Sequence, residues 1–276
     1  MDLSQSRLFT DHGSKEPMHL YGANGFPLGV YQPLLELLAQ DYNVGALANR
    51  ATWRPAVRLH KSRSWQIYAD DLITFLEQQA CGPVIGVGHS LGATTTVLAA
   101  KKRPDLFSKL VLIEPAMLAK PLAAMVKVLP KVIMTKINPV KGTLNKRERF
   151  TDRDDFLTHI KKFKGYAKFS EQMFELFADH SIIKNEQGDY QLAFPKHWEA
   201  HNYSQPPNIM RDIMKLEIPV VAIRGKPSMF FSHDMWRHWQ QACPHSTFLE
   251  SMAHGHLLPL EAPNLCGELI RTGLTE

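Results

Sequence analysis

The chain has 276 residues, of which 44% are hydrophobic and 21% are charged, so it is apolar enough to bury a large core and is not a disordered chain. Its formal net charge is +5 and its pI is near 9.0, but no nucleic-acid-binding motif accompanies the basic residues, so we expect no nucleic-acid partner. This length favours one large domain, with or without an inserted subdomain, over several unrelated modules.

The first residues mix Asp2, Gln5 and Arg7 with apolar side chains, and so lack the continuous apolar stretch of a secretory signal. The most apolar stretch, residues 121–134, is interrupted by lysines and is shorter than the ~18 residues expected of a membrane span. The three cysteines are widely spaced and odd in number, which favours reduced thiols over a disulfide framework. We therefore expect a soluble, cytoplasmic protein without stable membrane insertion.

Short apolar runs alternate with longer segments of helical periodicity, which predicts an α/β fold with a mostly parallel sheet flanked by helices. In the first part of the chain, strands are predicted at residues 19–22, 44–48, 84–87 and 110–113, and helices at residues 34–39, 64–79 and 90–102. The alternation resumes with strands at residues 218–223 and 247–250 and helices at residues 235–242 and 263–272.

Residues 117–207 interrupt this alternation. The segment reads as helical and basic, with thirteen Lys or Arg against four Asp or Glu between Lys120 and Lys168. This gives a local net charge of +9, while the rest of the chain carries −4. We expect a core domain formed by residues 1–116 and 208–276, with residues 117–207 inserted as a helical, basic cap, because loops tolerate insertions that strands do not.

Residues 88–92, Gly-His-Ser-Leu-Gly, match the G-x-S-x-G motif of a nucleophile elbow. The motif lies directly after a predicted strand and directly before a predicted helix, which is the context that it requires. The flanking glycines permit a sharp turn, and the helix N-terminus favours the negative charge that forms during acyl transfer. Ser90 is therefore the candidate nucleophile, and a glycine turn with an N-capping serine is the alternative.

The same glycines also suggest a dinucleotide-binding turn, because Gly86, Gly88 and Gly92 precede an acidic residue, Glu114. The spacing does not fit, since Leu91 occupies the place of the third glycine. The turn also follows at least two predicted strands instead of opening the domain. The sequence favours the nucleophile elbow.

With these features the chain resembles the α/β-hydrolase superfamily over nearly its whole length, apart from the inserted segment. In that family an early strand ends in His-Gly-x-Pro, and the third residue of the motif donates a backbone N–H to the oxyanion. Residues 24–27, Asn-Gly-Phe-Pro, match this pattern with Asn in place of His. The resemblance implies that the amides of Phe26 and Leu91 form the oxyanion hole, and a plain turn at residues 24–25 is the alternative.

Residues 255–263 resemble the catalytic histidine loop of the family, in which Gly-His follows the last strand and Glu-x-Pro precedes the final helix. The resemblance implies that His256 is the general base, with His254 as the competing histidine. The order of serine before histidine along the chain also agrees with the family.

The acidic partner of His256 departs from the usual pattern. Most members carry an aspartate in Gly-x-x-Asp after the strand predicted at residues 218–223, and here Ser228 occupies that position. Some relatives carry the acid one strand earlier, where this chain has Glu114. We expect Glu114 to bind His256 Nδ1, with Asp234 as the fallback acid. As alternatives, Glu114 pairs with the basic cap and Asp234 begins a helix.

These residues predict a two-step acyl transfer on a carboxylic ester, without a metal or other cofactor. A serine nucleophile excludes the relatives that form an alkyl-enzyme ester on an aspartate. Carbon–carbon bond hydrolases and lyases of the same fold also use Ser and His, and so stay as an alternative. A catalytically silent, ligand-binding protein of the same fold is the second alternative, favoured by the missing usual aspartate.

Two further features have simpler interpretations. His197 and His201 are spaced as a metal-binding pair, but the glutamate is not where H-E-x-x-H requires it, which favours a packing or surface role. The apolar, lysine-containing residues 121–134 fit a cover over the active site, an acyl pocket or a membrane-surface helix. The basic cap also suits an anionic substrate, although solvated charge is the usual meaning of such a segment.

Overall fold

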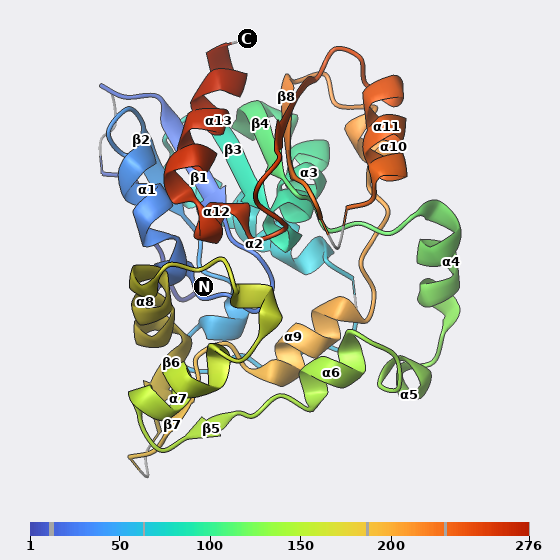
Figure 1. Ribbon diagram of the computed structural model, residues 1–276. Coiled ribbons are helices and arrows are strands. Elements are labelled where there is room, and N and C mark those ends of the chain that lie inside the picture. The colour runs from blue at the N-terminus through green and yellow to red at the C-terminus, as the bar shows by residue number, and fades with distance from the viewer. Residues whose placement is uncertain (11–13, 63, 186–187, 229–230, 276) are drawn as a thin grey trace.

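The computed structural model describes residues 1–10, 14–62, 64–185, 188–228 and 231–275. Its centre is a six-stranded sheet in the order β2-β1-β3-β4-β8-β9, and every pairing in it is parallel (Figure 1). This confirms the predicted α/β class with a parallel sheet. The strands are β1 (Pro17–Tyr21), β2 (Asn43–Ala46), β3 (Val84–His89), β4 (Phe107–Ile113), β8 (Val220–Gly225) and β9 (Thr247–Ser251).

Helices cover both faces of the sheet and close two apolar layers. One layer contains the apolar faces of α2 (Gln66–Gln79), α3 (Leu91–Lys102) and α11 (His233–Ala242). The other contains those of α1 (Gln32–Leu38), α12 (Leu258–Glu261) and α13 (Pro263–Thr275). The central strands are buried on both faces, which explains why they read as continuous apolar runs.

The predicted core elements all exist, and their ends shift by a few residues. The helix predicted from residue 90 begins at Leu91, because Ser90 adopts a non-helical backbone conformation. The helix predicted from residue 235 begins at His233, because the Ser232 side chain accepts a hydrogen bond from Met235 N–H and so caps the helix. Asp234 lies within the first turn of α11 and does not cap it.

The segment between β4 and β8 contains helices and a second, smaller sheet. The helices are α4 (Lys120–Val128), α5 (Lys131–Met134), α6 (Val140–Leu144), α7 (Arg153–Ile160), α8 (Glu171–Ser181), α9 (Lys196–Tyr203) and α10 (Met210–Ile213). The sheet is antiparallel in the order β5-β7-β6, with β5 (Arg149–Phe150), β6 (Ile182–Lys184) and β7 (Tyr190–Leu192). These strands were not predicted, because two or three residues carry no alternating pattern.

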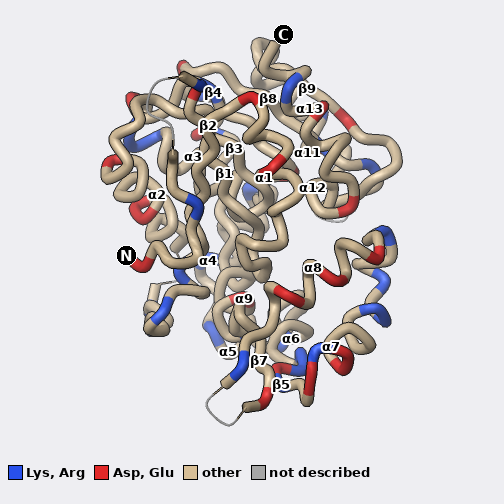
Figure 2. Tube along the Cα trace, turned by 90° about the vertical axis from the view of Figure 1, so that its left-hand side faces the viewer, with Lys and Arg blue, Asp and Glu red and all other residues tan. Residues whose placement is uncertain are grey.

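Figure 1 shows helices α4 to α9 on the side of the molecule beyond the carboxyl ends of the central strands. Figure 2 shows lysine and arginine side by side with acidic residues along α7 and β5. Within the described residues, no helix combines the length and the apolarity needed to cross a membrane.

Two histidines are buried in the core beside the strands. His19 in β1 is fully buried, and its Nε2 accepts a hydrogen bond from Leu47 N–H at 3.0 Å. His89 at the end of β3 is equally buried. Burial lowers the pKa of each imidazole to about 3, because a charged ring loses its hydration there. Both side chains are therefore neutral at pH 7.

This burial predicts that acid destabilises the protein well above the pH at which carboxylates titrate. Below pH ~6.5 the unfolded chain binds a proton at each histidine, whereas the folded chain does so only near pH 3, so stability falls as the pH falls through this window. The variant His19→Gln removes one such group. Between pH 7 and pH 5, its free energy of unfolding should fall by about 2 kcal/mol less than that of the wild type, as measured by urea unfolding.

The exposed His238 supplies the matched control, since His238→Gln removes a histidine without a buried environment. This variant shows what the change from histidine to glutamine does at an exposed position. An unchanged pH dependence in His19→Gln would contradict the assignment of a buried neutral imidazole.

Candidate active site

Ser90 lies at a sharp turn between β3 and α3. Its backbone angles are φ 55° and ψ −116°, a conformation that is strained for a residue with a side chain. Ser90 N–H donates to Ile113 O at 3.0 Å, and Ser90 O accepts from Ala116 N–H at 3.1 Å. The turn is therefore held to the last residue of β4 and to the loop that follows β4. This is the geometry of a nucleophile elbow.

The two flanking glycines are required by close backbone contacts. A Cβ on Gly92 would lie 2.0 Å from Tyr21 O, at the end of β1. A Cβ on Gly88 would lie 2.4 Å from Ala93 Cα. No shift of a flexible side chain relieves either overlap, because the obstructing atoms belong to the backbone. The G-x-S-x-G spacing therefore follows from how tightly β1, β3 and α3 meet.

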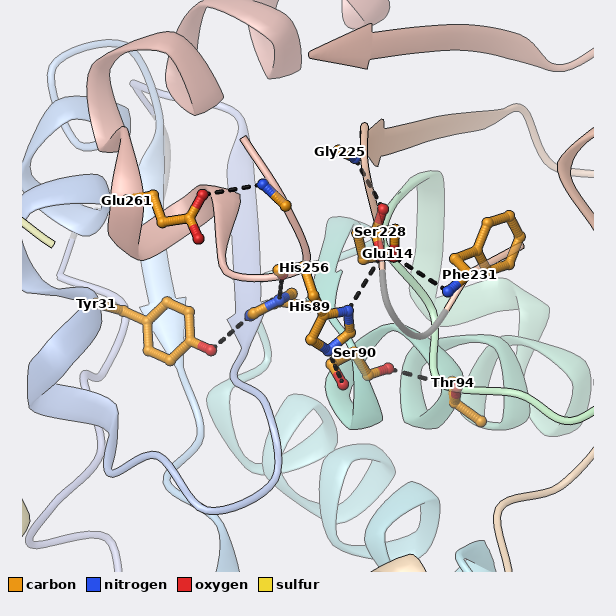
Figure 3. Close-up of polar contacts among 11 residues, drawn as sticks. Tyr31, His89, Ser90, Thr94, Glu114, Gly225, Ser228, Phe231, His256 and Glu261 are labelled. Atoms are coloured by element: carbon orange, nitrogen blue, oxygen red, sulfur yellow. Dashed lines mark hydrogen bonds and ion pairs between the residues drawn. The ribbon is translucent and has the colours of Figure 1, made fainter. Parts of the chain in front are cut away.

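The structure brings Ser90, His256 and Glu114 into one chain of hydrogen bonds (Figure 3). His256 Nε2 lies 3.0 Å from Ser90 Oγ, and His256 Nδ1 lies 3.1 Å from Glu114 Oε2. A carboxylate on Nδ1 fixes the tautomer in which Nδ1 carries the proton, so Nε2 is free to accept a proton from the serine. Sequence reasoning selected all three of these residues.

Glu114 is held by more than the histidine. Its carboxyl group is fully buried, and Oε1 accepts from Gly225 N–H at 2.8 Å. Oε2 accepts from Ser228 Oγ at 2.5 Å, and Ser228 Oγ accepts in turn from Phe231 N–H at 3.1 Å. The serine at the usual aspartate position thus donates a hydrogen bond to the acid that follows β4.

The competing residues lie elsewhere. Asp234 is exposed in the first turn of α11, and no described contact joins it to His256. His254 Nδ1 lies 2.9 Å from Ser251 Oγ. The loop that carries His256 is fixed by Glu261, whose Oε2 accepts from Gly255 N–H at 2.9 Å. This contact gives a structural reason for the glutamate after the histidine.

A second buried chain of hydrogen bonds lies next to the turn at Ser90, and most of its members were not predicted from the sequence. His89 Nε2 lies 2.7 Å from the carbonyl oxygen of His256, so Nε2 carries the proton. Nδ1 must then accept, and Tyr31 Oη donates to it at 2.7 Å. Tyr31 Oη itself accepts from Ala23 N–H at 2.8 Å. One tyrosine and one histidine thereby tie the loop after β1 to the loop that carries His256.

The predicted oxyanion donors differ in their surroundings. Leu91, which follows Ser90, is buried and lines the same cavity as Ser90. Phe26 N–H is directed at Ala23 O at 3.5 Å, and the Phe26 ring packs on Phe177. Asn24, which sequence reasoning passed over for this role, lines the cavity beside Ser90 and Leu91.

Asn24 is also tied to the inserted segment. Its Nδ2 donates to Glu199 O at 3.0 Å, and its Oδ1 accepts from Asn202 Nδ2 at 2.8 Å. Both partners lie in α9. Helix α9 therefore holds the loop after β1 in position beside the cavity at Ser90.

Two cavities meet at Ser90 and His256. The first, of about 320 Å³, is mainly apolar and lies under α4 and α5. Its apolar lining comprises Trp65, Leu91, Met117, Leu118, Leu122, Met125, Val126, Leu129, Met134 and Ile137. The second, of about 480 Å³, carries lysines among its lining residues, including Lys146, Lys164 and Lys168. A substrate whose reacting carbon lies at Ser90 can extend into either one.

The two histidines of α9 differ, since His197 is exposed and His201 is buried in a packed site. His201 Nε2 lies 2.9 Å from Ser62 O, and its ring meets the His60 ring edge to face at 4.8 Å. Within the described residues, no group of three or more His, Cys, Asp or Glu is arranged to hold a metal ion.

A family model described as the alpha/beta hydrolase fold matches residues 50–263. The chain therefore belongs to the α/β hydrolase fold family. Among solved structures, it is similar to E-2-(acetamidomethylene)succinate hydrolase, with a TM-score of 0.77 and 19% identity, covering 96% of this chain and 93% of the other. At this identity the similarity concerns the fold alone.

Two curated relatives from plants match shorter stretches. The karrikin insensitive 2 receptor IA of Petunia hybrida is 35% identical over 92 residues, which cover 32% of this chain and 34% of the receptor. A strigolactone esterase of Pisum sativum is 48% identical over 46 residues, or 17% of either chain. The match thus spans about a third of the receptor's length, and less of the esterase.

The elbow contacts predict that Gly92→Ala destabilises the fold. The new methyl group would overlap Tyr21 O, so β1 and α3 must separate, and we expect a loss of about 3 kcal/mol or more in the free energy of unfolding. Gly267→Ala is the matched control, because Gly267 also lies in a helix and its Cβ would meet only side-chain atoms at 3.5 Å or more. Urea unfolding compares the two variants. Equal stability of both would disprove the close contact.

Proposed function

We propose that the protein is a serine hydrolase acting on a carboxylic ester through an acyl-enzyme intermediate. The observation that carries the proposal is the continuous chain from Ser90 Oγ through His256 to Glu114, with spacings of 3.0 and 3.1 Å. It lies at the carboxyl edge of a parallel sheet and opens on an apolar cavity. The esterase among the plant relatives is consistent with this activity.

In the first step, His256 Nε2 takes the proton from Ser90 Oγ as that oxygen attacks the ester carbonyl carbon. The carbonyl oxygen becomes an oxyanion, and the Leu91 amide at the helix N-terminus donates to it. A second donor comes from the loop after β1, either Phe26 or Asn24. His256 then gives its proton to the leaving alcohol as the carbon–oxygen bond breaks, which leaves Ser90 acylated.

In the second step, His256 accepts a proton from water, and the resulting hydroxide attacks the acyl carbon. Collapse of that intermediate returns the proton from His256 to Ser90 Oγ and releases the carboxylic acid. Glu114 stabilises the imidazolium formed in both steps, and Ser228 and Gly225 hold the carboxylate in position.

We further propose that residues 117–207 act as a cap on a core formed by residues 1–116 and 208–276. Side chains of this segment provide most of the apolar cavity at Ser90, and α9 holds Asn24. The cap would therefore select the substrate, as a small or acyl-chain ester.

Two other functions remain candidates on specific observations. A carbon–carbon bond hydrolase would use the same Ser90 and His256. A ligand receptor is favoured by the similarity to a karrikin receptor over 92 residues. The hydrogen bond between Glu114 and His256 favours catalysis over a silent pocket, because a silent site does not need a fixed tautomer.

Hydrolysis of short p-nitrophenyl esters tests the proposal. The variant Ser90→Ala should lose turnover, and Glu114→Gln should lower kcat by roughly 10³–10⁴-fold, because the neutral amide cannot stabilise the imidazolium. Asp234→Asn is the matched control, and its kcat should equal that of the wild type.

A wild type that is folded but inactive on every ester tested would favour the receptor. A large loss of activity in Asp234→Asn with none in Glu114→Gln would instead assign the acid to α11. Circular dichroism and urea unfolding of each variant separate these outcomes from loss of the fold.

A further inference from the structure

The segment over the apolar cavity exposes an unusual amount of apolar surface. Six large apolar side chains between residues 122 and 137 are exposed, and two of them, Val128 and Val132, are 78% and 68% exposed. The other four are Leu122, Met125, Ile133 and Ile137. Scattered exposed apolar residues are common, but six within one short stretch form a patch that indicates a binding surface.

The charge on the same stretch is of one sign. Five exposed lysines lie between residues 120 and 141, and no Asp or Glu occurs between Glu114 and Glu148. The lysines are Lys120, Lys127, Lys131, Lys136 and Lys141. Elsewhere in the inserted segment basic groups meet acids, as Arg147 does with Asp155 and Arg153 with Asp179. The apolar patch is therefore bordered by basic groups within a stretch that contains no acid.

The patch is continuous with the cavity that contains the nucleophile. Leu122, Met125 and Ile137 are exposed, yet the same side chains line the cavity that reaches Ser90. Figure 1 shows α4 and α5 at the outer edge of the molecule, away from the central sheet. A chain-like apolar molecule can therefore pass from this surface to Ser90 along apolar side chains.

We propose that α4 and α5, with the residues that follow them to Lys141, form a docking surface for an anionic lipid bilayer. Apolar side chains bordered by lysines match the two components of such an interface, which are the acyl boundary and the negatively charged headgroups. A basic border does not by itself recognise a neutral protein surface. The bound state is peripheral, since no described helix is suited to span a membrane.

This docking surface extends the proposed function by naming its substrate class. It rests on the proposed esterase activity and assigns to it an ester with a long acyl chain that resides in a membrane. The acyl chain would leave the bilayer beside Met125 and Leu122 and enter the apolar cavity, which brings its carbonyl carbon to Ser90. Burying methylene groups in that cavity offsets the cost of leaving the bilayer.

The test is co-sedimentation of the Ser90→Ala protein with large vesicles, made of phosphatidylcholine alone or with added phosphatidylserine. Without turnover, this variant reports binding only, so the outcome does not depend on whether the proposed activity is correct. We expect binding to the vesicles that contain phosphatidylserine and much weaker binding to the neutral ones, with a loss of binding at high salt.

Two pairs of substitutions separate the charge from the apolar contact. Lys131→Glu with Lys136→Glu should weaken binding by about 30-fold or more, because each lysine near an anionic surface contributes a factor of about five. Lys162→Glu with Lys184→Glu makes the same change in net charge at two exposed lysines outside this surface, one after α7 and one at the end of β6, and should leave binding intact. Val128→Ser with Val132→Ser should also weaken binding, while hydrolysis of short soluble esters stays unchanged, because neither valine lines the cavity.

Three results would overturn the proposal. One is that the folded protein does not bind anionic vesicles. Another is equal binding of the two double lysine variants to the anionic vesicles. The third is a protein that does not bind vesicles but self-associates as its concentration rises, as measured by light scattering, with the self-association lost in the double valine variant. The patch would then be an interface between two copies of this chain. Loss of ester hydrolysis with vesicle binding retained would instead reject the activity and leave the docking surface in place.

Discussion

The site depends on the hydrogen bonds that the fully buried carboxyl group of Glu114 accepts. A buried carboxylate is costly unless hydrogen-bond donors surround it, and here two segments supply them, the end of β8 with the loop that follows it and the loop after β9. The donors are Gly225 N–H, Ser228 Oγ and His256 Nδ1. The need to satisfy one carboxylate therefore draws the ends of β4 and β8 and the loop after β9 to a single point beside the nucleophile.

This arrangement explains how an acidic residue that follows β4 can contact His256. Parallel strands place their carboxyl ends at one edge, so neighbouring loops reach the same space. Ser228 is too short and uncharged to stabilise an imidazolium, but its hydroxyl accepts from Phe231 N–H and donates to Glu114. Ser228 thus holds the Glu114 carboxyl group in position.

The sequence predicted those parts of the molecule that depend on local pattern. Buried parallel strands and the elbow glycines have short-range signals, and the fold class follows from their alternation. Ser90 could be selected from its motif directly after a predicted strand, whereas His256 and Glu114 were selected because their surroundings resemble those of the α/β-hydrolase superfamily. Asn24 and Tyr31 could not, since their importance comes from contacts with α9 and with His89, far away along the chain. The small antiparallel sheet was missed because its strands are too short for a pattern.

The segment between β4 and β8 combines two features that differ energetically. Its α9 end is tightly hydrogen-bonded to the loop over the nucleophile, through Asn202 and the backbone of Glu199. Its α4 and α5 end exposes apolar side chains that would be more stable if covered. The hydrogen-bonded end therefore lies beside Ser90, and the end with exposed apolar side chains is the one proposed above as a docking surface.

The central claim is that Glu114 and His256 activate Ser90, and its most direct test is reaction with a fluorophosphonate followed by peptide mapping in a mass spectrometer. The account predicts one stoichiometric adduct on the peptide that contains Ser90, and much slower labelling of folded Glu114→Gln protein. No adduct on folded wild-type protein, or an adduct on a different residue, would contradict it.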